Sequence, residues 1–265
     1  MNRSAYWENL TTTDFASPAV AEWIAVLPIA AIEQHGPHLP LSTDTAIARG
    51  VIRRTVELLP PDIPAVFLPV QSVGKSDEHI DFPGTLSLSW ETATRSWIEI
   101  GTSVFRAGIK KLVIVTSHGG NVSVMDIVAR ELRVRHAMLA VTTSWARMGV
   151  PENLLGSRES SYGIHGGEEE TSVMLALHPD LVRMDHARDF KSAQTLFETE
   201  YKRLRGHGPV QFGWKTGDLN AEGAMGNATA ATAEKGHAII DHQARGFLDV
   251  LRDIQCFDLS RLSDR

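Results

Sequence analysis

Four apolar stretches alternate with longer amphipathic stretches along the chain. The apolar stretches are rich in Val, Ile, Leu and Ala without strict polar alternation, which is typical of strands covered on both faces. They span 23–32, 64–70, 111–117 and 138–145. Apolar residues recur at helical spacing in 44–59, 89–107, 122–134, 169–177 and 232–256. The alternation predicts a three-layer α/β/α sandwich with a largely parallel sheet.

Two stretches have no regular pattern. The segment 74–88 contains a Pro-Gly pair, and the segment 206–229 is rich in glycine. Because long loops in a compact chain are usually functional or disordered, the second is a candidate element for substrate selection. No internal repeat or linker divides the sequence, and we expect one domain over 1–265.

Composition and charge narrow the classes of protein. The chain has 265 residues, 43% of them hydrophobic and 22% charged, as in globular proteins. A net charge of −6 without a long basic run disfavours nucleic acid and anionic membranes as partners. Met1 to Leu10 carries no apolar signal segment. No apolar run reaches the roughly 20 residues of a membrane span. The single cysteine, Cys256, allows no internal disulfide. These features predict a cytoplasmic protein.

The first group of reactive side chains follows the first predicted strand. Glu33 and His35 lie two residues apart on an extended segment, so their side chains point the same way. Asp44 begins the next helix in register with apolar Ile47 and Val51, which turns it inward. Asp44 alone would be interpreted as a first-turn acid. Because Glu33 and His35 place a carboxylate and an imidazole at the carboxyl end of a strand, the three residues together predict a metal site.

The second group follows the third predicted strand. His118 precedes the pair Gly119-Gly120, and glycines at such a turn let the backbone approach a ligand closely. A phosphate-binding loop is the alternative, but no Lys-Ser/Thr pair follows and the GxGxxG spacing is missing. Because the carboxyl ends of parallel strands share one edge of a sheet, we expect His118 beside the first group.

Three consecutive acids, Glu168, Glu169 and Glu170, form the third group. We expect Glu168 and Glu169 to be a solvated helix start that the helix dipole favours. Glu170 differs because Val173 and Met174 lie three and four residues on, which places it on the apolar face. A buried carboxylate needs a cationic partner. At this point the cationic partner of Glu170 can be either a metal ion or an arginine.

The sequence resembles the creatininase family of creatinine amidohydrolases and their relatives. The motifs that carry the resemblance are Glu33-Gln34-His35-Gly36-Pro37-His38 with Asp44, Glu78-His79 with Phe82-Pro83-Gly84-Thr85-Leu86, His118-Gly119-Gly120-Asn121, His165 with Glu170-Thr171-Ser172, and Ala231-Thr232-Ala233-Glu234-Lys235-Gly236. The resemblance implies a creatininase-like fold, two divalent metal ions and a homo-oligomer, often a hexamer. Oxygen and imidazole donors without thiolate suit zinc or manganese, with iron as a further option.

The resemblance also implies roles for single residues. It identifies as metal ligands Glu33, His35, Asp44 and His118, with Asp44 as the bridge. Creatininase itself has a glutamate two residues after the histidine that matches His118, whereas this chain has Gly120. We therefore assign the missing carboxylate to Glu170, which agrees with its inward register.

Four residues are expected to act on the substrate or to lie beside it. His165 matches a histidine proposed to move protons during ring opening and is the candidate catalytic residue. Trp145 is the counterpart of one tryptophan that closes over creatinine, and Tyr162 lies nearest the place of a second. His79 is expected to border the substrate, although a histidine that merely packs its loop is an equally open interpretation.

These features predict a metal-dependent amidohydrolase that acts on a small-molecule substrate. It would cleave a C–N bond of a small cyclic amide, a lactam or a related linear amide through a hydroxide between two ions. His165, with a near-neutral pKa, would protonate the leaving nitrogen. Formamide hydrolysis and C–C cleavage of cyclic diketones such as inososes are alternatives on the same site. A non-catalytic family member is disfavoured because the ligands are kept.

Overall fold

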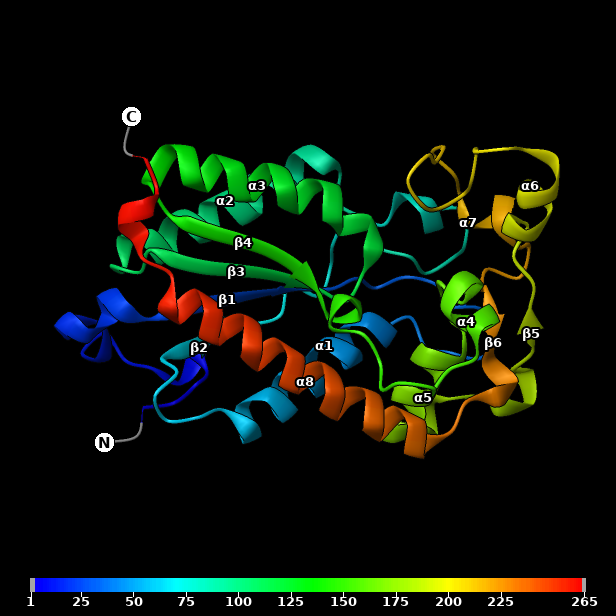
Figure 1. Ribbon diagram of the computed structural model, residues 1–265, viewed down its shortest axis with the longest axis horizontal. Helices are drawn as coiled ribbons and strands as arrows, with labels where there is room; N and C mark the ends of the chain where they lie inside the picture. The colour runs from blue at the N-terminus through cyan, green and yellow to red at the C-terminus, as the bar shows by residue number, and fades with distance from the viewer. Residues whose placement is uncertain (1–2, 264–265) are drawn as a thin grey trace.

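A four-stranded parallel sheet forms the centre of the protein, whose computed structural model describes residues 3–263 (Figure 1). Its strands are β1 (Ile24–Ile29), β2 (Ala65–Phe67), β3 (Lys111–Thr116) and β4 (Leu139–Ser144). The strand order is β2-β1-β3-β4, and every pairing is parallel. The carboxyl ends of β1, β3 and β4 therefore meet at one edge, and the predicted parallel sheet is confirmed.

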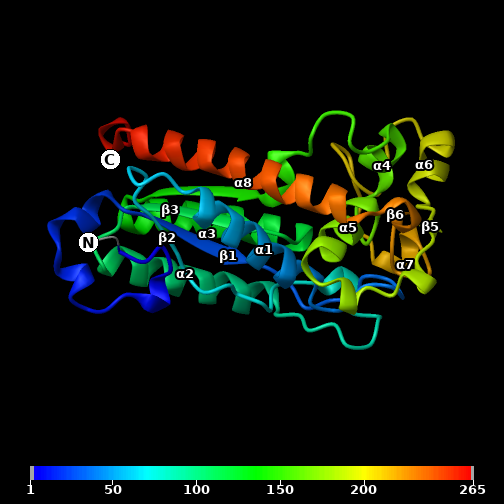
Figure 2. The same cartoon turned by 90° about the horizontal axis from the view of Figure 1, so that it is seen from below.

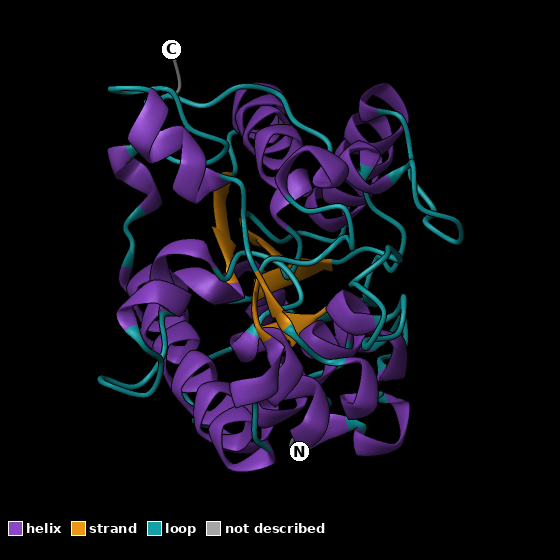
Figure 3. Ribbon diagram, turned by 90° about the vertical axis from the view of Figure 1, so that its right-hand side faces the viewer, coloured by secondary structure: helices purple, strands orange, loops and turns teal. Residues whose placement is uncertain are grey.

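Helices cover both faces of this sheet, as the three-layer prediction requires (Figures 2 and 3). The helices are α1 (Thr43–Leu58), α2 (Trp90–Arg106), α3 (Val122–His136), α4 (Ser157–Tyr162), α5 (Glu168–Leu177), α6 (Gln194–Glu200), α7 (Thr216–Leu219) and α8 (Ala233–Cys256). Helices α2 and α3 pack on one face, and α1 and α8 pack on the other. No helix within residues 3–263 is long and apolar enough to cross a membrane.

The strands contribute to two hydrophobic cores because their side chains alternate between the faces. Leu27 of β1 belongs to the core that contains Trp97 of α2 and Leu132 of α3. Its neighbour Val26 belongs to the other core, which contains Phe247 of α8. Since β1, β2 and β3 are buried throughout, they need few polar positions, which explains their continuous apolar pattern, whereas the half-buried β4 ends in Thr-Thr-Ser.

The remaining elements lie beyond the carboxyl edge of the sheet (Figure 1). They include α4, α6, α7 and a small antiparallel pair, β5 (Asp189–Phe190) with β6 (Gly226–Asn227). The glycine-rich segment 206–229 thus contains α7 and β6. The segment 74–88 holds only one short 3₁₀ turn, Asp77–His79.

Asn121 links the segment 74–88 to the end of β1. Asn121 donates from Nδ2 to the carbonyl of Ala30 at 3.1 Å and accepts from the backbone N–H of Lys75 at 2.9 Å. Gly74 permits this approach, because a Cβ there would lie 2.4 Å from the Ala30 oxygen. The segment therefore crosses the carboxyl end of β1, where the first predicted ligands lie.

Candidate metal centre

The five predicted ligands, which we call the ligand cluster, meet at the carboxyl edge of the sheet. Glu33 and His35 follow β1, Asp44 lies in the first turn of α1, His118 follows β3 and Glu170 lies in the first turn of α5. Glu33 and His35 are fully buried, Asp44 is 1% exposed and His118 is 5% exposed. The half-buried Glu170 closes the cluster on its outer side. The strand ends and helix starts of a parallel sheet bring these distant residues together.

Asp44 lies between two imidazole rings. Its Oδ1 is 3.6 Å from His35 Nε2, and its Oδ2 is 3.6 Å from His118 Nδ1. Glu170 Oε2 lies 3.7 Å from His35 Nε2, and Glu33 Oε1 lies 3.1 Å from His118 Nδ1. The Asp44 carboxylate thus adjoins both rings, and Asp44, Glu33 and His35 offer donor atoms close enough to share one ion.

Hydrogen bonds on the outer sides of the rings determine which nitrogens face the carboxylates. His35 Nδ1 is 3.1 Å from the Glu33 carbonyl oxygen, and His118 Nε2 is 3.0 Å from the Lys75 carbonyl oxygen. Because a carbonyl only accepts, these nitrogens carry the protons. The lone pairs of His35 Nε2 and His118 Nδ1 then face carboxylate oxygens, an arrangement that needs a cation between them.

Three atoms of the ligand cluster are buried without a hydrogen-bond partner among residues 3–263: Glu33 Oε1, His35 Nε2 and Asp44 Oδ2. Burial lowers the pKa of His35, but the carboxylates of Asp44, Glu170 and Glu33 outweigh it and raise that pKa to about 10. Burial lowers the pKa of His118 as well, but Glu33, Glu78 and Asp44 together outweigh it and raise that pKa. Without an ion the site takes up protons in its place, and its nitrogen and oxygen donors suit zinc or manganese.

Two further histidines border the ligand cluster. The ring of His165 lies 4.1 Å from that of His35 and 4.2 Å from that of His79, and His79 Nε2 is 3.3 Å from Glu33 Oε1. His165 Nε2 is 2.7 Å from the Gln34 carbonyl oxygen and donates to it, so the lone pair of Nδ1 faces Glu33 Oε1 at 3.7 Å. Burial and the neighbouring His35 lower the pKa of His165 to about 3, below the near-neutral value expected from the sequence.

Glu78 belongs to this site although no role was predicted for it. Its Oε1 lies 3.3 Å from His118 Nε2, and its pKa falls to about 2, because His118 outweighs the effect of burial, which raises it. A Cβ at Gly120 would lie 2.0 Å from Glu78 Oε1. The Glu78 carboxylate thus occupies the space that a side chain at position 120 would need. Its place beside His79 in the sequence was the only available sign of this role.

Gln34 and Thr216 support His79 from behind. Gln34 Nε2 lies 2.6 Å from His79 Nδ1 and donates to the Gly223 carbonyl at 2.8 Å. Thr216 Oγ1 is 2.8 Å from the same His79 Nδ1. Since Thr216 and Gly223 belong to the glycine-rich segment 206–229, that segment buttresses the site, whereas its predicted part in substrate selection stays a prediction.

The prediction of a solvated start for α5 is wrong. Glu168 is only 6% exposed and pairs with Lys235 of α8. Glu169 is half-buried and accepts from Gln243 Nε2 at 3.1 Å. Burial and the adjacent Glu170 raise the pKa of Glu169 to about 7. Helix α8 covers this turn, a tertiary contact that the local sequence of α5 does not reveal.

The predicted substrate residues are distributed over different places. A cavity of about 200 Å³ adjoins the ligand cluster, and Trp145, Glu169, Gln243, His118 and Glu170 contribute to its walls. Trp145 is also embedded in the core, where its ring packs edge-on against a phenylalanine of α8. The structure does not bring Tyr162 to the cluster; its hydroxyl donates to Glu198 at 2.5 Å, beside a separate cavity of about 140 Å³.

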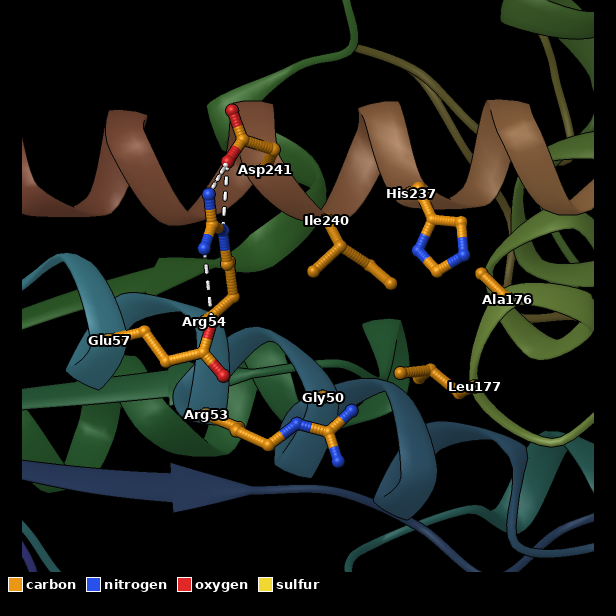
Figure 4. Close-up of a pocket in the computed structure, with 9 residues that line it drawn as sticks. All are labelled: Gly50, Arg53, Arg54, Glu57, Ala176, Leu177, His237, Ile240 and Asp241. Carbon is orange, nitrogen blue, oxygen red and sulfur yellow. Dashed lines mark hydrogen bonds and ion pairs between the residues drawn. The ribbon is translucent and has the colours of Figure 1, made fainter.

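A larger groove of about 420 Å³ runs between α1 and α8 (Figure 4). Arg54 projects across it and donates to Asp241 at 2.6 Å and to Glu57 at 3.0 Å. Within residues 3–263, every group of three or more potential metal ligands that lie close enough to share an ion is at the ligand cluster or directly beside it, and none lines this groove. The groove therefore has no part in the metal centre.

The fold and the site together define the class of protein, an α/β protein with a cluster of potential metal ligands at the carboxyl edge of its parallel sheet. Residues 8–251 match the sequence model of the family described as creatinine amidohydrolase. The match spans nearly the whole chain, and the chain belongs to this creatininase family.

Individual relatives agree with this assignment. The chain is 32% identical over 231 residues to the mycofactocin precursor peptide peptidase of Mycolicibacterium smegmatis, covering 86% of this chain and 84% of that protein. It is 29% identical over 274 residues to the creatinine amidohydrolase of Pseudomonas putida, covering 96% and 98%. A solved creatininase structure designated Mn is 28% identical with a TM-score of 0.75, covering 95% of this chain and 98% of that one. These likenesses support amidohydrolase activity.

Proposed function

We propose that this protein uses two divalent ions, zinc or manganese, to hydrolyse the C–N bond of a small amide. The observation that carries the proposal is the Asp44 carboxylate between two imidazoles whose lone pairs face it. His35 and Glu170 would hold one ion with Asp44, and His118 and Glu33 would hold the other. Ions bound there lower the pKa of water and polarise a carbonyl group.

His165 is the proposed proton carrier. Its Nε2–H donates to the Gln34 carbonyl, so Nδ1 carries the lone pair that can accept a proton, and this lone pair faces Glu33 at the edge of the ligand cluster. It would take a proton from the attacking water at Nδ1 and deliver it to the leaving nitrogen. The role is the one expected from the sequence, that of a histidine that moves protons and protonates the leaving nitrogen.

The size of the adjoining cavity favours a small substrate. At about 200 Å³ it is smaller than the roughly 300–1,000 Å³ of sites for drug-sized ligands. A cyclic or short linear amide therefore fits best, as in the relative named creatinine amidohydrolase. The second candidate is the end of a peptide, which the relative named peptide peptidase favours. In that case only a terminal portion would enter the cavity.

A metal-reconstitution assay tests the proposal. The purified chain is stripped with a chelator, reloaded with Mn²⁺ or Zn²⁺, and offered creatinine, 2-pyrrolidinone, an N-formyl amino acid, an inosose and short peptides. We expect cleavage of an amide that disappears on stripping and returns with two equivalents of metal, measured by mass spectrometry of the products. Full activity in the stripped protein would reject the proposal, and cleavage of peptides alone would select the second candidate.

A charge-matched pair of variants controls this assay. Glu33→Gln removes a buried donor from the ligand cluster, whereas Glu22→Gln makes the same change at an exposed position before β1. We expect the first variant to lose metal and activity and the second to keep both.

A further inference from the structure

Glu159 is a buried acid outside the ligand cluster. It lies in α4 and is only 7% exposed. Its Oε1 accepts from the backbone N–H of Glu168 at 2.6 Å, and its Oε2 accepts from the backbone N–H of Asn227 at 2.8 Å. One carboxylate therefore joins three separate elements: α4, the first residue of α5, and β6.

Three glycines make room for this carboxylate. A Cβ would lie 2.1 Å from Glu159 Oε1 if built at Gly163, 2.2 Å at Gly167 and 2.6 Å at Gly226. Real Cβ atoms do not approach an oxygen so closely, so a side chain at any of these positions would displace the carboxylate. The local backbone is built around Glu159, and the glycines are required for its fit.

The segment held in this way carries two residues of the site. His165 lies between Gly163 and Gly167, and its backbone carbonyl accepts from Met225 N at 2.7 Å, next to β6. Gly166 donates its N–H to Glu170 Oε2 at 2.6 Å, the oxygen that faces His35. Glu159 thus constrains the segment on both sides, through Glu168 and through Asn227.

We propose that Glu159 is a positioning residue that fixes the segment 163–167 and the first turn of α5, so that His165 faces the ligand cluster and Glu170 takes its place within it. The inference rests on the proposed metal-dependent function. A carboxylate can accept at both oxygens, whereas an amide accepts at one and presents N–H groups at the other. Glu159→Gln would therefore leave a buried backbone N–H without an acceptor and shift the segment that it holds.

Titration of the metal-free full chain with Mn²⁺ tests the proposal. For Glu159→Gln we expect the ion on the Glu170 side to bind at least tenfold more weakly, as is usual for lost outer contacts of a metal site. The ion on the His118 side should bind within about threefold of wild type, since nothing on that side contacts Glu159. A general loss of folding would instead weaken the binding of both ions and lower the melting temperature of the variant.

Asp189→Asn is the matched control. Asp189 lines the same cavity of about 140 Å³ and pairs with Arg158 on the surface, but within residues 3–263 its carboxylate accepts from no backbone N–H. The control removes the same charge from the same place, and we expect wild-type affinity for both ions. Unchanged Mn²⁺ binding in Glu159→Gln, or an equal loss in Asp189→Asn, would overturn the proposal.

If Glu159→Gln does not fold, a variant that changes no charge tests the positioning role of Glu159. Gly163→Ala keeps every charge and displaces the carboxylate, so it should reproduce the selective loss of one ion. If the wild-type chain binds two equivalents of neither Mn²⁺ nor Zn²⁺, the proposed function is rejected. Hydrogen exchange over 163–170 then tests Glu159 alone: faster exchange in Glu159→Gln than in Asp189→Asn supports the inference, and equal exchange overturns it.

Discussion

Helix α1 contributes to two cavities that differ in kind. Its first turn places Asp44 in the ligand cluster, beside a cavity of about 200 Å³, whereas Arg54 from a later turn crosses the groove of about 420 Å³ shown in Figure 4. In the groove, Arg54 is paired with Asp241 and Glu57, and these side chains reach solvent. In the cluster, buried donor atoms face one another without partners.

The difference shows that unsatisfied buried atoms identify this site better than cavity size does. Native proteins pair nearly all buried polar groups, so a concentration of exceptions indicates a ligand that supplies what is missing. Exposed ion pairs such as those of Arg54 need no further partner and contribute little to stability. Substitutions in the two places should therefore have effects of very different size.

The largest effect is expected for Asp44→Ala. Removing a buried ligand that faces both rings should cost more than the about 10–100-fold in metal affinity or activity that is usual for outer contacts of a metal site. Because Asp44 faces both His35 and His118, we expect the loss of at least one of two bound ions together with hydrolysis. Metal content by mass spectrometry and rates on a cleaved amide measure this. Two ions and a wild-type rate would contradict it.

An intermediate effect is expected for Glu78→Gln. Glu78 faces His118 Nε2, the ring nitrogen on the outer side, so its charge orients the ring and strengthens it as a ligand. We expect about 10–100-fold weaker Mn²⁺ binding by calorimetry. Asp77→Asn is the control, because this exposed neighbour carries the same charge and does not contact His118. If both variants weaken Mn²⁺ binding equally, the effect comes from the lost charge in general and not from the contact between Glu78 and His118.

The smallest effect is expected for Arg54→Met in the groove. The variant loses exposed ion pairs, which contribute at most about 1 kcal/mol to the free energy of unfolding. Urea unfolding should show a change of this size, and metal content and hydrolysis should match wild type. A clear loss of activity would show that the groove takes part in function. It would contradict the claim that only the cavity beside the ligand cluster does so.

The sequence predicts the architecture well because the pattern of each element is local. Continuous apolar stretches indicated the parallel strands, and the shared carboxyl edge of such strands brought Glu33 and His118 together as expected. The inward register of Glu170 on α5 likewise predicted its approach to His35. These successes depend on spacing within single elements and on one general rule of sheet topology.

The failures concern contacts between distant segments. Glu78 lies on an irregular segment whose path depends on Asn121, so its approach to His118 could not be inferred from spacing. Glu168 is buried by Lys235, a residue of α8 far along the chain. The pKa of His165 is low because of burial and His35, which no local pattern shows. Tertiary packing decides each of these cases.

The mutual exclusion between Glu78 and a side chain at position 120 has an evolutionary consequence. A Cβ at Gly120 would meet both the Glu78 carboxylate, at 2.0 Å, and His118 Nε2, at 2.4 Å. A larger residue at 120 therefore requires both the Glu78 side chain and the His118 ring to shift, so its effect depends on the residue at 78. We expect the two positions to show strong epistasis, with viable histories passing through paired changes rather than independent ones.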